Sequence, residues 1–365
     1  MKRKPELVVD VITKKNTTYL PSQITFSSLA KKREVSEALG FETTDELDRY
    51  LNNHFMFTVY LDDVPTYATG DVEKIKKSEQ EGLVTVDWDN KRMVDCWGLE
   101  FEMFAPNGFN NLRNPLKDCD EDEIDAWTAP SIDAVDMDTR FQFADADLKK
   151  YGEEYLVMVS GYNGIFEKGY NLLEFGNFMC YLLTEPDMID RLLGKVTDFK
   201  VEIAKETAKR GFMMGHYGDD LGMQTGELFS LDAFRRSILP HIKRVFRVFK
   251  DAGLPVQMHS CGNIVKFIPD LIDAGLDVLE PVQPVMDIQY LKREFGKDLT
   301  FYGGVDTQEL LVFDTPERVR EETLRTIDVL GKGGGYIVAP AQEVMPDVPL
   351  ENILAFIEAV KSVQS

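Results

Sequence analysis

LPVQMHSCGNIVKFIPDLIDAGLDVLEPVQP, residues 254–284, contains the pattern that decides the fold. A short apolar run ends in polar residues, an amphipathic stretch of helical length follows, and a second apolar run comes after a glycine. Strands that alternate with helices of about ten residues or more indicate βαβ units, in which neighbouring strands are parallel. The stretch therefore predicts a strand, a helix and a second strand of one parallel sheet.

The same alternation continues on both sides of this stretch. Helical stretches separate apolar runs that end in polar residues: YLVMVSG from residue 155, GFMMGHYGDD from 211, LPVQMHSCG from 254, LDVLEPVQP from 276, LTFYGGVD from 299 and GGYIVAPAQ from 334. No glycine-rich dinucleotide fingerprint follows the first run, which favours a (β/α)8 TIM barrel over a doubly wound sheet. The remaining strands are expected in the N-terminal part, near HFMFTVYL at 54–61.

The first 150 residues are expected to form an irregular N-terminal extension and the first barrel elements. Residues 41–53 predict a helix, which Thr43 or Thr44 can cap. Apolar and polar residues alternate over residues 83–104 around a central Asp-Asn pair, which predicts a β-hairpin. The chain is expected to be one domain, 1–365, whose barrel core spans residues 151–365.

Composition and charge restrict the class of function. The chain has 365 residues, of which 44% are hydrophobic, and a formal net charge of -22. A surface this acidic repels phosphates and anionic lipids, so the sequence disfavours nucleic-acid and membrane-surface roles. It contains no apolar run of roughly 20 residues for a membrane helix and no secretory signal pattern. Its four scattered cysteines predict no disulfide framework. These features together predict a cytoplasmic protein.

Polar residues that could bind a ligand or take part in catalysis lie at the end of each of the six apolar runs. In a TIM barrel the C-terminal ends of the strands open on one face, where the loops build the active site. The residues at these ends are Gly161, Tyr162, Asn163, His216, Asp219, Asp220, His259, Cys261, Glu280, Gln283, Asp306, Gln342 and Glu343. A single polar strand end is explained by capping of the next helix. Six ends that converge predict a functional pocket.

His259 and Cys261 are candidate metal ligands. Positions i and i+2 of a strand point to the same side, so both side chains can reach one ion. Imidazole nitrogen and thiolate sulfur are both good zinc ligands, although a buried thiol beside a hydrogen-bonded histidine also explains the pair on its own. Glu280 ends the next strand. A His/Cys/Glu set from adjacent strand ends predicts an open zinc site, able to activate water or to act as a Lewis acid on a substrate oxygen or sulfur.

Several longer segments resemble the uroporphyrinogen decarboxylase superfamily. These are YGDDLGMQTGELFSLDAFRRSILPHIKRV, HSCGNIVKFIPDLIDAGLDVLEPVQP, FYGGVDTQELL and GGGYIVAPAQEVMPDVPLENI. The resemblance covers about residues 150–365 and extends only loosely to the N-terminal part. True decarboxylases of this superfamily carry an arginine-rich RQAGR-type segment that binds porphyrinogen carboxylates. TYLPSQITFSSLAKKREV stands in its place here.

The other branch of the superfamily contains zinc-dependent methyltransferases that work with a corrinoid protein. They carry an HxC motif, which His259 and Cys261 match. The barrel of cobalamin-independent methionine synthase is similar, and Glu280 lies where its glutamate ligand would fall. The resemblance implies a last Cys or His ligand where this chain has Gln342. Three alternatives follow: Glu343 substitutes, a substrate or water fills the fourth position, or the metal site is weakened or lost.

The resemblance implies a zinc-dependent methyltransferase that demethylates a small substrate, with an aryl methyl ether as the first candidate. The methyl group would pass to the cobalt of a separate corrinoid protein, because the chain lacks the DxHxxG signature of corrinoid binding. The implied metal ligands are His259, Cys261, Glu280 and Gln342. The implied acid–base residues are His216, Asp219 and Asp220, and the implied substrate-binding residues are Tyr162, Asn163, Gln283 and Asp306.

Other functions remain open from the sequence. Methyl transfer from the corrinoid to tetrahydrofolate or a thiol is one. A cofactor-free decarboxylase is another, although the acidic and neutral strand ends count against it. A barrel that has lost its metal and serves as a binding or assembly subunit is the third, and Gln342 is its only support. The methyl donor, the direction of transfer and the choice between monomer and homodimer are not decided by the sequence.

Overall fold

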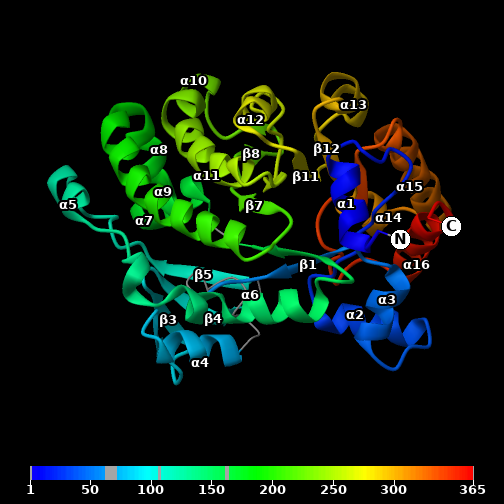
Figure 1. Cartoon of the computed structure of the whole chain (residues 1–365), viewed down its shortest axis with the longest axis horizontal. Helices are drawn as coiled ribbons and strands as arrows, with labels where there is room; N and C mark the ends of the chain where they lie inside the picture. The colour runs from blue at the N-terminus through cyan, green and yellow to red at the C-terminus, as the bar shows by residue number, and fades with distance from the viewer. Residues whose placement is uncertain (1, 62–71, 106–107, 161–163, 365) are drawn as a thin grey trace.

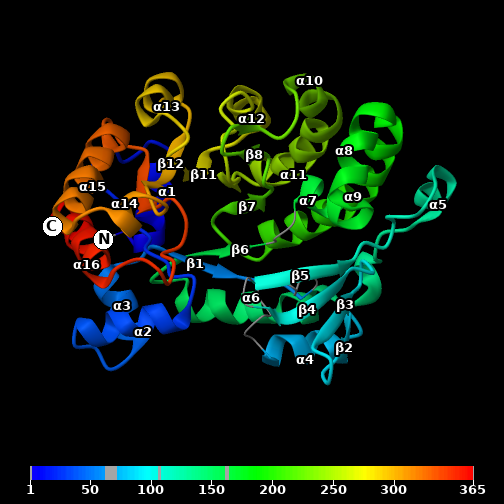
Figure 2. The same cartoon turned by 180° about the vertical axis from the view of Figure 1, so that it is seen from behind.

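Short parallel strands form the centre of the molecule. The computed structural model describes residues 2–61, 72–105, 108–160 and 164–364, and Figures 1 and 2 show it from opposite sides. The parallel strands are β1 (Phe55–Thr58), β6 (Leu156–Val159), β7 (Gly215–Gly218), β10 (Val256–His259), β11 (Val278–Val282), β12 (Thr300–Val305) and β13 (Tyr336–Pro340). The predicted alternation of strands with helices is therefore present.

The parallel strands follow one another around an open barrel. Five of them pair in the order β13-β12-β11-β10-β7, and β1 pairs with β6 in a second parallel sheet. The segment 21–26 joins the two sheets, because Ser22 forms a parallel bridge with Val338 of β13 while its carbonyl oxygen accepts the amide of His54, next to β1. Pro21 has no amide hydrogen, and the segment makes only isolated bridges.

The predicted α/β class with parallel strands is confirmed, whereas the predicted closed eight-stranded barrel is not formed by strand pairing in the described residues. No backbone ladder joins β6 to β7 there, and the segment 21–26 takes the place of a full strand.

Helices cover the outer face of the parallel strands. Those of the C-terminal part are α7 (Ile165–Leu173), α8 (Phe175–Thr184), α9 (Pro186–Lys209), α10 (Leu231–Ala233), a π-helical turn (Phe234–Ile238), α11 (Leu239–Asp251), α12 (Ile268–Ala274), α13 (Ile288–Phe295), α14 (Leu310–Phe313), α15 (Pro316–Gly331) and α16 (Leu350–Ser362). Among the described residues, no helix combines the length and the apolar character needed to cross a membrane.

The N-terminal part packs against both sides of the barrel. Its helices are α1 (Lys4–Ile12), α2 (Leu29–Ala38), α3 (Thr44–Leu51), α4 (Val72–Gln80), α5 (Glu121–Ala126), a 3-10 turn (Ile132–Ala134) and α6 (Met137–Tyr151). The first helices lie beside the last ones in both views (Figures 1 and 2). Lys361 of α16, for example, donates a hydrogen bond to the carbonyl oxygen of Tyr50 in α3.

The predicted hairpin is the first part of an antiparallel sheet. Its strands are β2 (Val84–Asp87), β3 (Arg92–Asp95), β4 (Glu100–Ala105) and β5 (Gly108–Arg113), paired in that order. A further short hairpin joins β8 (Gly222–Met223) to β9 (Gly226–Glu227). The pairing of Asp87 with Arg92 places the first turn around the Asp-Asn pair, as the alternation predicts. The sheet and α4 share a small apolar cluster of their own, and together they lie to one side of the barrel (Figure 1).

The barrel interior has an apolar floor that α1 closes. Val8 and Ile12 of α1 pack against inward residues of the strands, among them Met158, Met214 and Val278. Side chains alternate along a strand, so the residue two positions beyond an inward apolar residue also points inward, but nearer the C-terminal end. His216 stands above Met214 in this way, as Glu280 stands above Val278. The polar strand ends thus rest on a dry, packed layer.

Val8→Ala tests the role of α1 as this floor. Val8 is 0% exposed, so removing two methyl groups should lower the free energy of unfolding by about 2 kcal/mol. Val9→Ala is the matched control, because Val9 is only partly buried at the same cluster, and its cost should stay below about 1 kcal/mol. Urea-induced unfolding followed by circular dichroism measures both variants. Equal losses would contradict the assignment.

Candidate functional site

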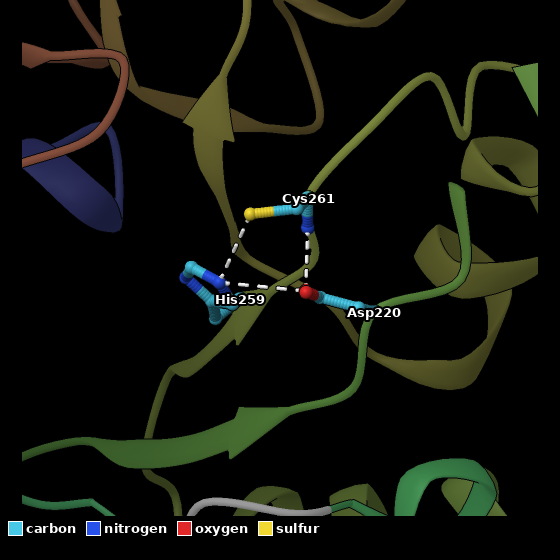
Figure 3. Close-up of side chains that lie close together, drawn as sticks. All are labelled: Asp220, His259 and Cys261. Atoms are coloured by element: carbon cyan, nitrogen blue, oxygen red, sulfur yellow. Dashed lines mark hydrogen bonds and ion pairs between the residues drawn. The ribbon is translucent and has the colours of Figure 1, made fainter. Parts of the chain in front are cut away.

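Three of the predicted residues meet at two neighbouring strand ends (Figure 3). Asp220 follows β7, His259 ends β10, and Cys261 comes two residues later. The Nε2 atom of His259 lies 3.5 Å from the Sγ atom of Cys261 and 3.5 Å from the Oδ1 atom of Asp220. One potential ligand atom from each residue lies within 4.8 Å of the others. The backbone amide of Cys261 donates to Asp220 Oδ1 at 2.8 Å, which ties the two loops together.

Glu280 contacts the opposite nitrogen of the same imidazole ring. Its Oε2 atom lies 2.7 Å from His259 Nδ1. Burial lowers the pKa of His259, but the carboxylate of Glu280 and the thiol of Cys261 raise this pKa well above its usual value. Burial by itself raises the pKa of Glu280. The charge of His259 and its hydrogen bond to Glu280 lower this pKa more, and the result lies below the usual value. The structure therefore places Glu280, a predicted ligand, where it orients the histidine and leaves Nε2 facing Cys261 and Asp220.

Two glutamine amides face the sulfur of Cys261. Gln342 Nε2 lies 3.6 Å from Cys261 Sγ, and Gln283 Nε2 lies 3.8 Å from it. Gln283 is held in place because its Oε1 atom accepts the amide of Gly262 at 2.7 Å. Two amide donors therefore point at one sulfur, which can accept a hydrogen bond from each. Gln342, which stands at the expected last ligand position, thus presents its amide nitrogen to the sulfur.

Asp219 anchors the start of a helix. Its carboxylate accepts the backbone amides of Phe166 at 3.0 Å and Glu167 at 2.8 Å, and the hydroxyl of Tyr217 at 2.6 Å. Burial raises the pKa of Asp219, although these three hydrogen bonds lower it. Asp219, predicted as an acid–base residue, therefore holds the N-terminus of α7 against β7. Its neighbour Asp220 turns toward His259.

A cavity of about 230 Å³ lies over the strand ends, and two of the three donor residues, Asp220 and His259, line it. His216, Asp220, His259 and Glu280 line it together with Gln342 and Glu343. The Nδ1 atom of His216 is buried and has no hydrogen-bond partner in the part of the chain that the structure describes. Burial lowers the pKa of His216 to about 4, so its imidazole is neutral at neutral pH.

Glu167 is a cavity residue that the strand ends did not predict. It lies in the first turn of α7 and lines the same cavity as His259. Burial raises the pKa of Glu167 to about 8, and the carboxylates of Asp219 and Asp220 contribute to this shift. Burial also raises the pKa of Glu343, with a contribution from Glu280. In the sequence Glu167 looks like an ordinary acidic residue in the first turn of a helix, so no local signal distinguishes it.

Asp306 lies outside this group of residues. Its carboxylate accepts the backbone amides of Gln308, Glu309 and Leu310, at 2.7, 3.2 and 3.4 Å. It lines a separate cavity of about 680 Å³. The structure does not bring this predicted substrate-binding residue to the cavity of His259. Tyr162 and Asn163, also predicted to bind substrate, lie outside the described residues.

Comparison with known families decides where this chain belongs. The model of the uroporphyrinogen decarboxylase (URO-D) family matches residues 98–363. The chain belongs to this family. The superfamily predicted from the C-terminal segments is therefore confirmed, and the match extends into the antiparallel sheet of the N-terminal part, beyond the segments that resemble the family in the sequence.

Curated relatives of this URO-D family member include methyltransferases and decarboxylases. The methylated-thiol–coenzyme M methyltransferase of Methanosarcina mazei is 27% identical over 185 residues, 51% of this chain and 47% of the relative. The methylcobamide:CoM methyltransferase MtaA of Methanosarcina barkeri is 20% identical over 202 residues, 55% and 57%. A uroporphyrinogen decarboxylase of Pseudoalteromonas translucida is 24% identical over 190 residues, 51% of each chain. The chain thus spans about half the length of the curated relatives it matches.

A solved structure shares the whole fold. A methyltransferase from Methanosarcina mazei superposes with a TM-score of 0.66 at 15% sequence identity, and the match covers 100% of both chains. This likeness shows that the open barrel and the N-terminal part together are a fold found in another protein.

The raised pKa of Glu167 predicts a pH dependence of stability in the metal-free protein. The folded state holds the proton of this carboxyl group up to about pH 8, whereas the unfolded chain releases it near 4.5. The free energy of unfolding therefore falls as the pH rises through this window. Glu167→Gln removes this loss, so the variant should gain on the order of 1 kcal/mol over the wild type at pH 8 and little at pH 4.5.

Urea titrations of chelator-treated protein at the two pH values measure this gain. Glu358→Gln, at an exposed position of α16, is the matched control and should show the same small difference at both. An equal effect of Glu167→Gln at the two pH values would show that the folded state does not hold this proton.

Proposed function

We propose that this protein is a zinc-dependent methyltransferase that moves a methyl group between a small thiol and a corrinoid carried by a separate protein. The observation that carries the proposal is the set of donor atoms from Asp220, His259 and Cys261. The two relatives named as methyltransferases support the reaction class, and the name of one of them specifies a methylated thiol.

The spacing of the donor atoms fits a zinc ion. Ligands around tetrahedral zinc, at the usual bond lengths to nitrogen, oxygen and sulfur, lie about 3.5 Å from one another. His259 Nε2 lies 3.5 Å from both Cys261 Sγ and Asp220 Oδ1. A carboxylate on the other ring nitrogen, as Glu280 provides, is the common outer partner of a zinc-bound histidine. Three protein ligands leave the fourth position open, so Gln342 is not needed as a ligand.

Zinc in this position would act as a Lewis acid that favours the thiolate form of the substrate. Side chains of the protein would transfer the proton and orient the metal ligands. Glu167, whose pKa is raised to about 8, holds a proton at neutral pH and would donate it to the thiolate that is released when the methyl group passes to the corrinoid; in the reverse direction it would take the thiol proton back. Glu280 would hold the imidazole of His259 in one tautomer. The amides of Gln283 and Gln342 would fix the sulfur of Cys261 and keep it directed at the metal.

An aryl methyl ether, the first candidate from the sequence, would use the same metal site. We favour the thiol because the methylated thiol in the name of one relative is a sulfur substrate. The cofactor-free decarboxylase also has relatives in this family. It is disfavoured because a carboxylate-rich substrate would enter a cavity lined by Glu167, Asp220, Glu280 and Glu343.

His259→Ala should abolish metal binding and methyl transfer. The variant removes the ligand that both other donors face, so the transfer rate should fall by more than about 100-fold, the upper limit for loss of an outer partner. Zinc content by elemental analysis and the cobalt spectrum of a reduced corrinoid protein with methylated thiols give the two readouts. His241→Gln is the control, because His241 of α11 bonds to Asp190 instead. Full activity of zinc-free His259→Ala would rule out the proposal.

Glu280→Gln distinguishes an orienting residue from a ligand. The variant keeps a hydrogen-bond acceptor for His259 but loses the charge, so zinc affinity should fall about 10- to 100-fold without being lost. Competition with a chromophoric chelator measures the affinity. If the variant binds zinc as poorly as His259→Ala, Glu280 is itself a ligand, as the sequence predicted.

A further inference from the structure

We infer that the thiol substrate is a cation, with a positive charge close to its sulfur; this inference rests on the proposed function. The cavity over the metal ligands is lined by the carboxyl groups of Glu167, Asp220, Glu280 and Glu343. None of the described residues that line it is a lysine or an arginine. A ligand that enters this cavity therefore meets carboxyl groups on several sides and no lysine or arginine among the described residues.

A zinc ion does not compensate this charge. Its two positive charges are balanced by the carboxylate of Asp220 and the thiolate of Cys261, which leaves Glu280 beside a neutral His259. Among the described residues, Glu167 accepts hydrogen bonds from the hydroxyl of Tyr170, at 3.5 Å, and from the backbone amide of Gly164, which are both neutral groups. No lysine or arginine in the described part of the chain forms a salt bridge with Glu167 or Glu343. Buried carboxylates without a cationic partner are costly, and a positively charged substrate would supply that partner.

The remaining lining also suits a small cation. The Phe57 and Tyr302 side chains line the cavity, and aromatic faces attract ammonium groups. The imidazole of His216 lines it as well, and because burial lowers its pKa to about 4, this ring adds no positive charge at neutral pH. A cavity of about 230 Å³ admits a thiol of a few carbons rather than a cofactor-sized molecule.

The adjoining cavity does not supply a net positive charge that would attract an anionic substrate. Thr25 and Glu343 line both cavities, so the two cavities adjoin. Its basic side chains are Lys32, Arg49 and Lys150, and its acidic ones are Asp45, Asp48, Glu154 and Glu343. Lys32 is already paired with Asp48 at 2.6 Å. An anionic tail of a longer substrate would find no surplus of positive charge there.

Three thiols of similar size test the inference on the zinc-loaded full chain. The probes are 2-aminoethanethiol, which is cationic, 2-mercaptoethanol, which is neutral, and 3-mercaptopropionate, which is anionic. Isothermal titration calorimetry gives the binding constants without any methyl transfer. The cationic thiol should bind at least about tenfold more tightly than the anionic one, with the neutral thiol between them.

Glu343→Gln and Glu167→Gln connect this preference to the cavity. The titrations are made at pH 9, above the pKa of about 8 to which burial raises Glu167, so that each variant removes one negative charge there. Each should reduce the ratio of cationic to anionic binding by about threefold or more. Glu358→Gln removes the same charge from an exposed position of α16 and should leave the ratio unchanged. Urea titration of each variant confirms that it is folded under the assay conditions.

The outcomes separate the inference from the proposed function. Equal binding of the cationic and anionic thiols, an unchanged ratio in both cavity variants, or no binding of any of the three thiols would overturn the inference. Methyl transfer without a charge preference would support the proposed function and overturn the inference. A clear preference for 2-aminoethanethiol without any methyl transfer would support the charge of the ligand and contradict the methyltransferase.

Discussion

The parallel register of β7, β10 and β11 is the constraint on which the site depends. It places His259 opposite Gly218 on one side and opposite Glu280 on the other. Gly218 has no side chain, so nothing from β7 fills the space beside the imidazole at this level. On the other side the carboxylate of Glu280 reaches Nδ1 at 2.7 Å. Shifting any of these strands by one residue would turn its inward side chains outward and dismantle the site.

The sequence predicted the C-terminal part better than the N-terminal part, and the reason is the length of the local pattern. Each βαβ unit, such as residues 254–284, carries a strong periodic signal in both its strands and its helix. The segment 21–26 carries none, because its isolated bridges depend on β13, which lies more than three hundred residues later in the chain. Closure of the barrel is likewise a long-range property. The hairpin at β2 and β3 was predictable because its turn is local.

The candidate site was likewise predicted only in part from the sequence. His259, Cys261, Asp220 and Glu280 follow from the rule that strand ends converge on one face, and the structure brings all four together. The roles within this set did not follow, because they depend on the orientation of the His259 ring, which turns Nδ1 toward Glu280 and Nε2 toward Cys261 and Asp220. Asp306 obeys the same rule, yet its carboxylate is taken by three backbone amides. Glu167 reaches the cavity from the helix α7, and the rule on strand ends makes no prediction for helix residues.

The carboxyl groups above the barrel floor connect the fold with the proposed metal and the proposed substrate. The floor of the barrel is apolar and closed by α1, so water reaches the strand ends from one side only and the carboxylates above the floor are poorly solvated. Such groups either hold protons, as the raised pKa of Glu167 indicates, or bind cations. A zinc ion would satisfy the groups around His259, and the carboxyl groups of Glu167 and Glu343 would still lack a cationic partner. Under the proposed function, a methyl acceptor would pass those outer carboxyl groups on its way to the metal, so its charge would be selected before its sulfur reached the site.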